Sequence, residues 1–79
     1  MNKLRRTQIK EIMDQIEELK SRIEALSEEE QESFENLPDS LQLCINGQKM
    51  EEAAASLDEA ADLIEEACGS LLTAMGDQT

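Results

Sequence analysis

The sequence predicts an all-α protein, a two-helix antiparallel hairpin that assembles into an oligomeric helical bundle. Apolar residues recur with heptad spacing in the first half of the chain, and an alanine-rich apolar stripe fills the second half. The chain has 79 residues, and a lone domain of that size buries only about 60% of its unfolded surface. Disulfides, metals or self-association supply the missing core in such domains. Because the chain has two cysteines and no histidine, we expect self-association.

The first helix is expected over residues 3–36. Asn2 can cap its start, and no residue breaks helical geometry before Pro38. The spacing of three and four residues places six apolar side chains on one face. These are Ile9, Ile12, Ile16, Leu19, Ile23 and Leu26. Met13 and Phe34 widen this stripe, which favours a bundle with several neighbours over a free two-stranded coiled coil.

The apolar seam weakens after Leu26, where Ser27 precedes three glutamates. Ser27 and Glu30 fit a capping box, so a helix restart at this point is one alternative. We favour a continuous helix because the flanking residues are good helix formers. On that interpretation the segment is solvated and lies partly outside the bundle.

Residues 37–47 are expected to connect the two helices. Pro38 suits the first turn of a short helix, and Asn46-Gly47 is a turn signal. These residues predict a loop with a single helical turn near residues 38–44. Its apolar side chains, with Cys44 as a small hydrophobic residue, should cover the end of the bundle. They are Leu37, Leu41, Leu43 and Ile45.

The second helix is expected over residues 48–75, with Glu51 and Glu52 in its first turn and Gly76 at its end. Two apolar rows overlap on it. One contains Ala53, Ala60, Ala67 and Ala74, and the other contains Met50, Ala54, Ala61, Cys68 and Met75. Both rows include Leu57, Ile64 and Leu71, which match the seven-residue spacing of the isoleucines. We therefore expect these three residues to share the oligomer core with the six-residue seam of the first helix.

The net charge of −12 is unevenly distributed, because residues 1–10 carry +4 and the remaining residues carry −16. An acidic body argues against general nucleic-acid binding, whereas a basic end can hold one discrete anion. In an oligomer, several copies of this basic cluster could surround a phosphate-rich small ligand. The alternatives are pairing with an acidic helix end of a neighbour and contact with a polynucleotide. The basic cluster consists of Lys3, Arg5, Arg6 and Lys10.

The carboxylates of the second helix could be mistaken for the magnesium ligands of an all-α nucleotide pyrophosphatase. They occur opposite the alanine row, so we expect a solvated face and no metal site. They are Glu51, Glu52, Asp58, Glu59, Asp62, Glu65 and Glu66. Since the chain lacks histidine and tyrosine and its cysteines are on apolar stripes, we predict no enzyme and no cofactor. No apolar run approaches the roughly 20 residues of a membrane span, so we expect a cytoplasmic protein without membrane contact.

The opening MNKLRR with its isoleucine heptads, the EEEQESFENLPDSLQ stretch and the EEAAASLDEAADLIEEA repeat resemble small helical-hairpin proteins of phages and prophages of Gram-positive bacteria. The resemblance covers nearly the whole chain and implies an accessory phage protein in the host cytoplasm. Such proteins often counter host defence. The resulting hypothesis is a non-catalytic protein that either holds an anionic signalling nucleotide with its basic cluster or docks its acidic faces on a basic host protein. A decoy for nucleic acid is one form of the second version. The alternative is a coiled-coil structural or assembly protein without a small ligand.

Overall fold

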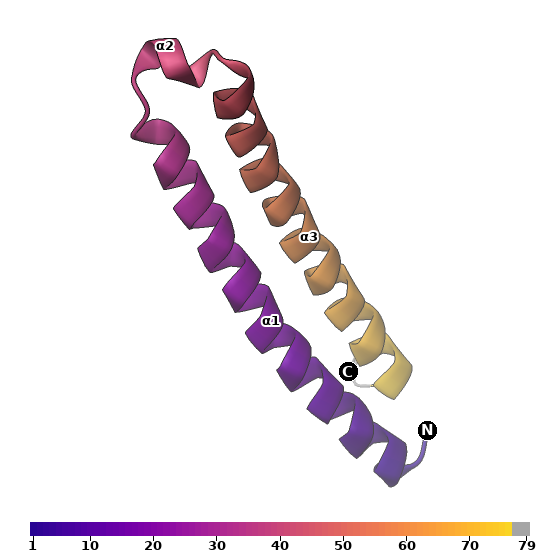
Figure 1. Ribbon diagram of the computed structural model, residues 1–79. Helices are drawn as coiled ribbons and strands as arrows, with labels where there is room; N and C mark the ends of the chain where they lie inside the picture. Colours follow the sequence, from indigo (N-terminus) through magenta and orange to yellow (C-terminus); the bar gives the residue numbers. More distant parts are fainter. Residues whose placement is uncertain (77–79) are drawn as a thin grey trace.

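The computed structural model describes residues 1–76. Over these residues the chain forms three helices and no strand, α1 (Lys3–Glu35), α2 (Asp39–Gln42) and α3 (Ile45–Met75). The predicted all-α class is confirmed. Figure 1 shows α1 and α3 side by side and running in opposite directions, with α2 at the end where they are joined. The molecule is elongated, with principal extents of 58 × 18 × 15 Å.

Both ends of α1 are capped by side chains. Asn2 Oδ1 accepts a hydrogen bond of 2.8 Å from the backbone N–H of Arg5, as its position in the sequence predicts. At the other end, Gln42 Nε2 donates to the carbonyl oxygens of Phe34 at 3.2 Å and of Leu37 at 3.1 Å. The Phe34 carbonyl oxygen also accepts from the backbone N–H of Leu37 at 3.1 Å, so Gln42 adds a second donor at the end of the helix, where carbonyls lack intrahelical partners. Between its caps α1 is continuous through Ser27, without a restart.

The start of α3 differs from the sequence-based expectation. Asn46-Gly47 does not form a turn, because both residues belong to the first turn of α3, which begins at Ile45. A Cβ at Gly47 would lie 2.6 Å from the Gln42 carbonyl oxygen and still closer to that of Leu41. Glycine therefore permits close approach of the α2 backbone rather than a reversal of the chain. Because α3 begins three residues earlier than predicted, neither Glu51 nor Glu52 is in its first turn, which contains no acidic residue.

The C-terminal end of α3 follows the prediction. The helix ends at Met75, and Gly76 adopts the left-handed conformation with φ of 75°. Its N–H donates a 3.0 Å hydrogen bond to the Thr73 carbonyl oxygen. Glycine adopts this conformation without the steric cost that a Cβ would bring, which explains why the helix stops at this point.

Contact between α1 and α3 is made by one row of residues on each helix, in steps of three and four. The α1 row is Ile9, Met13, Ile16, Lys20, Ile23, Ser27, Glu30 and Phe34. The α3 row is Gly47, Met50, Ala54, Leu57, Ala61, Ile64, Cys68, Leu71 and Met75. Within the chain, the seam predicted on α1 is thus divided. Its isoleucines at 9, 16 and 23 are half-buried against α3, whereas Ile12, Leu19 and Leu26 remain 46–53% exposed.

Two expectations about burial are wrong. Ser27 is only 3% exposed, so the segment after Leu26 is not a solvated extension. The connection does not cover the end of the helices either, since Leu41, Leu43 and Ile45 are all exposed and only Leu37 is half-buried. The backbone of α2, and not these side chains, lies against the first turn of α3 at Gly47.

Candidate functional site

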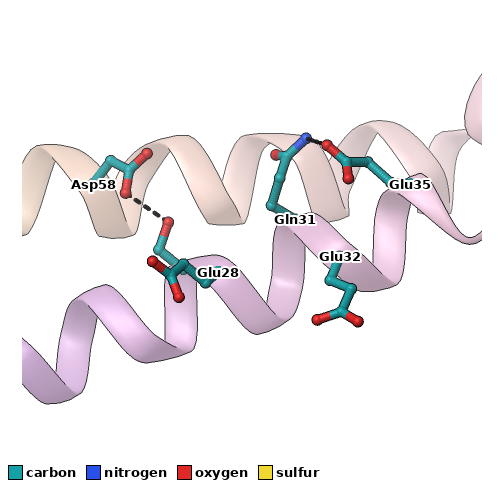
Figure 2. A pocket seen from close by; sticks show the side chains of 6 residues that line it. Glu28, Gln31, Glu32, Glu35 and Asp58 are labelled. Carbon is teal, nitrogen blue, oxygen red and sulfur yellow. Dashed lines mark hydrogen bonds between the residues drawn. The ribbon is translucent and has the colours of Figure 1, made fainter.

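An open hollow of about 600 Å³ lies along the groove between α1 and α3. Five of its lining residues come from the last third of α1, and Asp58 comes from α3 (Figure 2). Helical spacing brings the α1 residues together, because residues three, four and seven positions apart share a face. The hollow is lined by Ser27, Glu28, Gln31, Glu32, Glu35 and Asp58.

Ser27 and Asp58 join the two helices at the inner edge of the hollow. The Ser27 hydroxyl lies 2.7 Å from Asp58 Oδ1 and 3.0 Å from the Ala54 carbonyl oxygen. It carries one proton, so it donates to one of these acceptors at a time. Because Ser27 is small and buried, α1 and α3 can approach closely at this point. The contact holds the Asp58 carboxylate at the hollow, as Figure 2 shows.

The other carboxylates of the hollow are less constrained. Gln31 Nε2 donates a 3.2 Å hydrogen bond to Glu35 Oε1, whereas Glu32 points away from that pair (Figure 2). Within residues 1–76 the structure gives no ion pair to Glu28 or Glu32. The lining therefore presents four carboxylates and no basic side chain, which creates a negative potential open to solvent.

This acidic lining does not make a metal site. Among the residues that the structure describes, no group of three or more potential ligands is arranged to hold a metal ion. The predicted carboxylates of the second helix are all exposed, as expected. Two of them nevertheless contact α1, since Asp58 accepts from Ser27 and Glu65 pairs with Lys20 at 3.6 Å.

The predicted basic cluster lies at the opposite end of α1 from the hollow. Lys3, Arg5, Arg6 and Lys10 are all exposed on the first turns of the helix, and none of them lines the hollow. The antiparallel arrangement brings the C-terminal end of α3 close to them, and Gly76 is near the Arg6 guanidinium. The negative end of the α3 dipole thus offsets part of the repulsion between these cations and the positive end of α1.

The two cysteines differ in environment. Cys68 is buried in the α1–α3 contact. Burial raises the pKa of its thiol, and the neighbouring Glu17 carboxylate raises that pKa further. Cys44 is half-buried at the start of α3, where its thiol donates to the Leu41 carbonyl oxygen at 2.7 Å. The low thiolate fraction of Cys68 makes it a structural residue rather than a nucleophile.

Sequence reasoning missed the Ser27–Asp58 contact. The signal that could have found it is the row that starts at Ile9 and steps by four and then three residues, because this row passes through Ser27. The glutamates after Ser27 instead suggested a solvated segment. Asp58 could not be assigned to a partner from the sequence, since 31 residues separate it from Ser27.

Comparison of the chain with protein-family models, with curated proteins and with solved structures found no match in any of the three. Functional residues are therefore assigned from the geometry of the chain itself. Among the described helices, none is both long and apolar enough to cross a membrane.

Proposed function

We propose that the protein is a non-catalytic binding protein whose acidic hollow docks on a basic surface of a partner protein. The observation that carries this proposal is the gathering of four carboxylates from two helices around one open depression. An exposed row of charges along a single helix is a common solvated face, but here the groove between two helices gives the acidic surface a concave shape. A protruding lysine or arginine of a partner fits such a depression.

Electrostatics gives this interaction its selectivity. A concave acidic surface focuses its potential and steers a basic partner toward it, with an association rate that falls as salt rises. The Ser27 hydroxyl holds Asp58 in place before the partner arrives, which lowers the cost of ordering that side chain on binding. Glu28 and Glu32 lack ion-pair partners within the described chain and are available to an arriving cation.

The resemblance to phage accessory proteins adds a class of partner. On this proposal the chain blocks a component of host defence by covering a basic groove on that component. A nucleic-acid-binding groove is one such surface, because carboxylates along a helix can take the place of phosphates.

Charge reversal tests where binding occurs. The double variant Glu28→Lys, Glu32→Lys removes two carboxylates from the hollow, and Glu11→Lys, Glu18→Lys is a control with the same charge change on exposed α1 residues away from it. With an oligo-arginine peptide as the probe in calorimetry, we expect the first variant to weaken binding at least tenfold more than the control. Equal losses would show that binding depends on net charge alone and would refute a localised site.

A second candidate function is supported by the basic cluster. The four cations are exposed together at the N-terminal end of α1, where the first-turn amides and the helix dipole also favour an anion. On this proposal, copies of the cluster hold an anionic signalling nucleotide and so sequester it. Calorimetry with a panel of cyclic nucleotides tests this function, with Arg5→Gln, Arg6→Gln expected to abolish binding and Arg22→Gln to retain it. Absence of binding to every nucleotide of the panel would exclude the sequestration of cyclic nucleotides.

Both proposals include self-association of the two-helix chain into an oligomeric bundle. The support is the small size of the core within one chain. Over the described residues, the buried hydrophobic side chains are those of Ala54, Ala61, Cys68 and Met75, whereas ten large hydrophobic side chains are at least 41% exposed. A protein of this size gains little stability from such a core. If neither a basic peptide nor a nucleotide binds, the alternative is a structural or assembly protein without a small ligand.

A further inference from the structure

A second apolar surface runs along one side of the molecule, outside the α1–α3 contact. We call it the Leu19 face. From α1 it contains Ile12, Leu19 and Leu26, which are 46%, 49% and 53% exposed. From α3 it contains the row Ala53, Ala60, Ala67 and Ala74, of which Ala60 is half-buried and the others are exposed.

The two halves of the Leu19 face lie on the same side because the helices are antiparallel. On α1 its residues come three positions after Ile9, Ile16 and Ile23 of the contact row, and on α3 they come three positions after Met50, Leu57, Ile64 and Leu71. Equivalent flanks of two antiparallel helices point to one side of the pair. The contacts Ser27–Asp58 and Lys20–Glu65 are formed by residues on the other flank of each helix. The acidic hollow therefore lies on the side of the molecule opposite the Leu19 face.

Charge is segregated between these two sides. The side opposite the Leu19 face carries five carboxylates, with the basic Lys10 at the N-terminal end of the same flank. The carboxylates are Glu17, Glu24, Glu51, Asp58 and Glu65. The residues that border the Leu19 face on the outside are mostly uncharged. They are Gln8, Gln15, Arg22, Glu29, Lys49, Ser56, Leu63 and Ser70, and Leu63 is itself 57% exposed. Because each chain has a net charge of −12, a second copy can approach closely only on a side with few carboxylates.

The Leu19 face is also large enough for an interface. Ala53 and Ala74, the ends of the alanine row, are 21 positions apart, or about 32 Å at ~1.5 Å per residue. With the 18 Å width of the molecule this gives a flat area of about 570 Å². The accessible area of a ridged helical surface exceeds its flat projection, so the face approaches the ~800 Å² that each partner contributes to a standard interface.

We infer that a second copy of this chain covers the Leu19 face, packed end for end about a twofold axis that passes through Leu19 and between Ala60 and Ala67. This inference rests on the self-association included in the proposed function. The contacts Ser27–Ala54, Ser27–Asp58 and Lys20–Glu65 place Leu19 at the level of Ile64 on α3. The face is symmetric about that level, because Ile12 and Leu26 are each seven residues from Leu19, and the alanines of the row lie in pairs on either side of it, 60 with 67 and 53 with 74. The arrangement packs α1 on α1 and brings the two alanine rows together, where small side chains permit close approach.

The distribution of charge along the helix axis favours this orientation over the alternative, in which the two copies point the same way. End-for-end packing about Leu19 brings the basic N-terminal end of one copy to the level of the acidic residues 28–32 of the other, with Lys10, Glu28 and Glu32 on the outer sides of the dimer and not in contact across the interface. Packing in the same direction would place the two basic clusters together and the two acidic ends together, which costs free energy. The end-for-end dimer leaves its two acidic hollows on opposite outer sides, so it can bind two basic partners.

The test measures the mass of the full chain by light scattering. We expect wild-type protein to have twice the 8.8 kDa chain mass, or an even multiple of it, and Leu19→Asp to have the chain mass. The matched control is Leu43→Asp, since Leu43 is 78% exposed but lies outside the face, and this variant should keep the wild-type mass. A monomeric wild-type chain would refute self-association itself, whereas a fully associated Leu19→Asp variant would refute only the assignment of the face.

A crosslinking experiment tests the orientation and does not depend on the stability of Leu19→Asp. In a Cys44→Ser, Cys68→Ala background, Leu19→Cys should form a disulfide between two copies on oxidation, because Leu19 is at the twofold axis. If the copies instead pointed the same way, Leu19 would face α3 of the second copy, near Ala67. In that case Leu19→Cys alone would stay reduced, and a mixture with Ala67→Cys would crosslink, which would overturn the end-for-end arrangement.

Discussion

Two glycines of α3 should respond in opposite directions to the same substitution. Gly69 is within the helix, and a Cβ added there would meet no atom within 4 Å. Alanine is more favourable than glycine in a helix by about 0.8–1.0 kcal/mol, so Gly69→Ala should stabilise the fold by about 1 kcal/mol. For a domain of 60–100 residues this corresponds to a rise in Tm of roughly 4–8 °C.

Gly47→Ala brings the same gain in helix propensity, but its Cβ would clash with main-chain atoms of α2. The new Cβ would lie 2.6 Å from the Gln42 carbonyl oxygen and closer still to that of Leu41. These are main-chain atoms, so α2 must shift as a unit, and overpacking of this kind costs typically about 1–3 kcal/mol. The shift also moves Gln42 away from the carbonyls at the end of α1, and each hydrogen bond lost there costs about 0.5–1.5 kcal/mol. After the propensity gain, a net destabilisation of about 1–2 kcal/mol remains.

The measurement is thermal and urea unfolding followed by circular dichroism. Both variants and the wild-type chain must be compared at one protein concentration, because association makes Tm depend on concentration. If Gly47→Ala raised Tm as much as Gly69→Ala, the close contact between α2 and the first turn of α3 would be refuted. Asn46-Gly47 would then have to be reconsidered as a flexible turn.

Substitutions at three further positions test single contacts. Ser27→Ala should lower the free energy of unfolding by about 1 kcal/mol through loss of the buried hydroxyl contact, whereas Ser33→Ala, on an exposed residue, should change it by less than about 0.5 kcal/mol. Gln42→Leu should destabilise the end of α1, and Gln42→Glu should destabilise it more because a carboxylate would face the same carbonyls; equal melting of the two variants would contradict this. Burial and Glu17 raise the pKa of Cys68 above 9.0, so its stabilising contribution is complete below that pH and is lost as pH rises through the folded-state pKa. Urea titrations from pH 8 to 10.5 should accordingly show a steeper loss of stability for the wild-type chain than for Cys68→Ala.

The sequence was sufficient for features set by local chemistry. The all-α class follows from the apolar periodicity, the start of α1 from Asn2, and the end of α3 from Gly76. Features that depend on which residues meet were not accessible. Asn46-Gly47 has the composition of a turn, and only the approach of α2 explains why a glycine belongs to a helix at that point.

The acidic hollow shows the same limit at the level of the candidate site. Its α1 glutamates are visible as a charged run in the sequence, and the basic cluster is visible in the same way at the other end. The hollow itself requires Asp58, and Asp58 reaches it only because α3 packs on α1 in one register. The second helix offered two overlapping apolar rows, and the contact with α1 uses the row with Ala54, Ala61 and Cys68. That choice turns Asp58 toward Ser27.

Two neighbouring residues of the first-helix seam should now separate folding from association. Ile16 is half-buried against α3, whereas Leu19 is 49% exposed within the chain. Ile16→Asp removes an apolar side chain whose full burial is worth about 1.5–3 kcal/mol and replaces it with a carboxylate that must be desolvated. We expect this variant to lose helical circular dichroism and to become monomeric together. Leu19→Asp should become monomeric while it keeps most of its helicity at high protein concentration and low temperature. If both variants lost helicity to the same extent, the folding of the chain and its association would be one step, and neither residue would act on one of them alone.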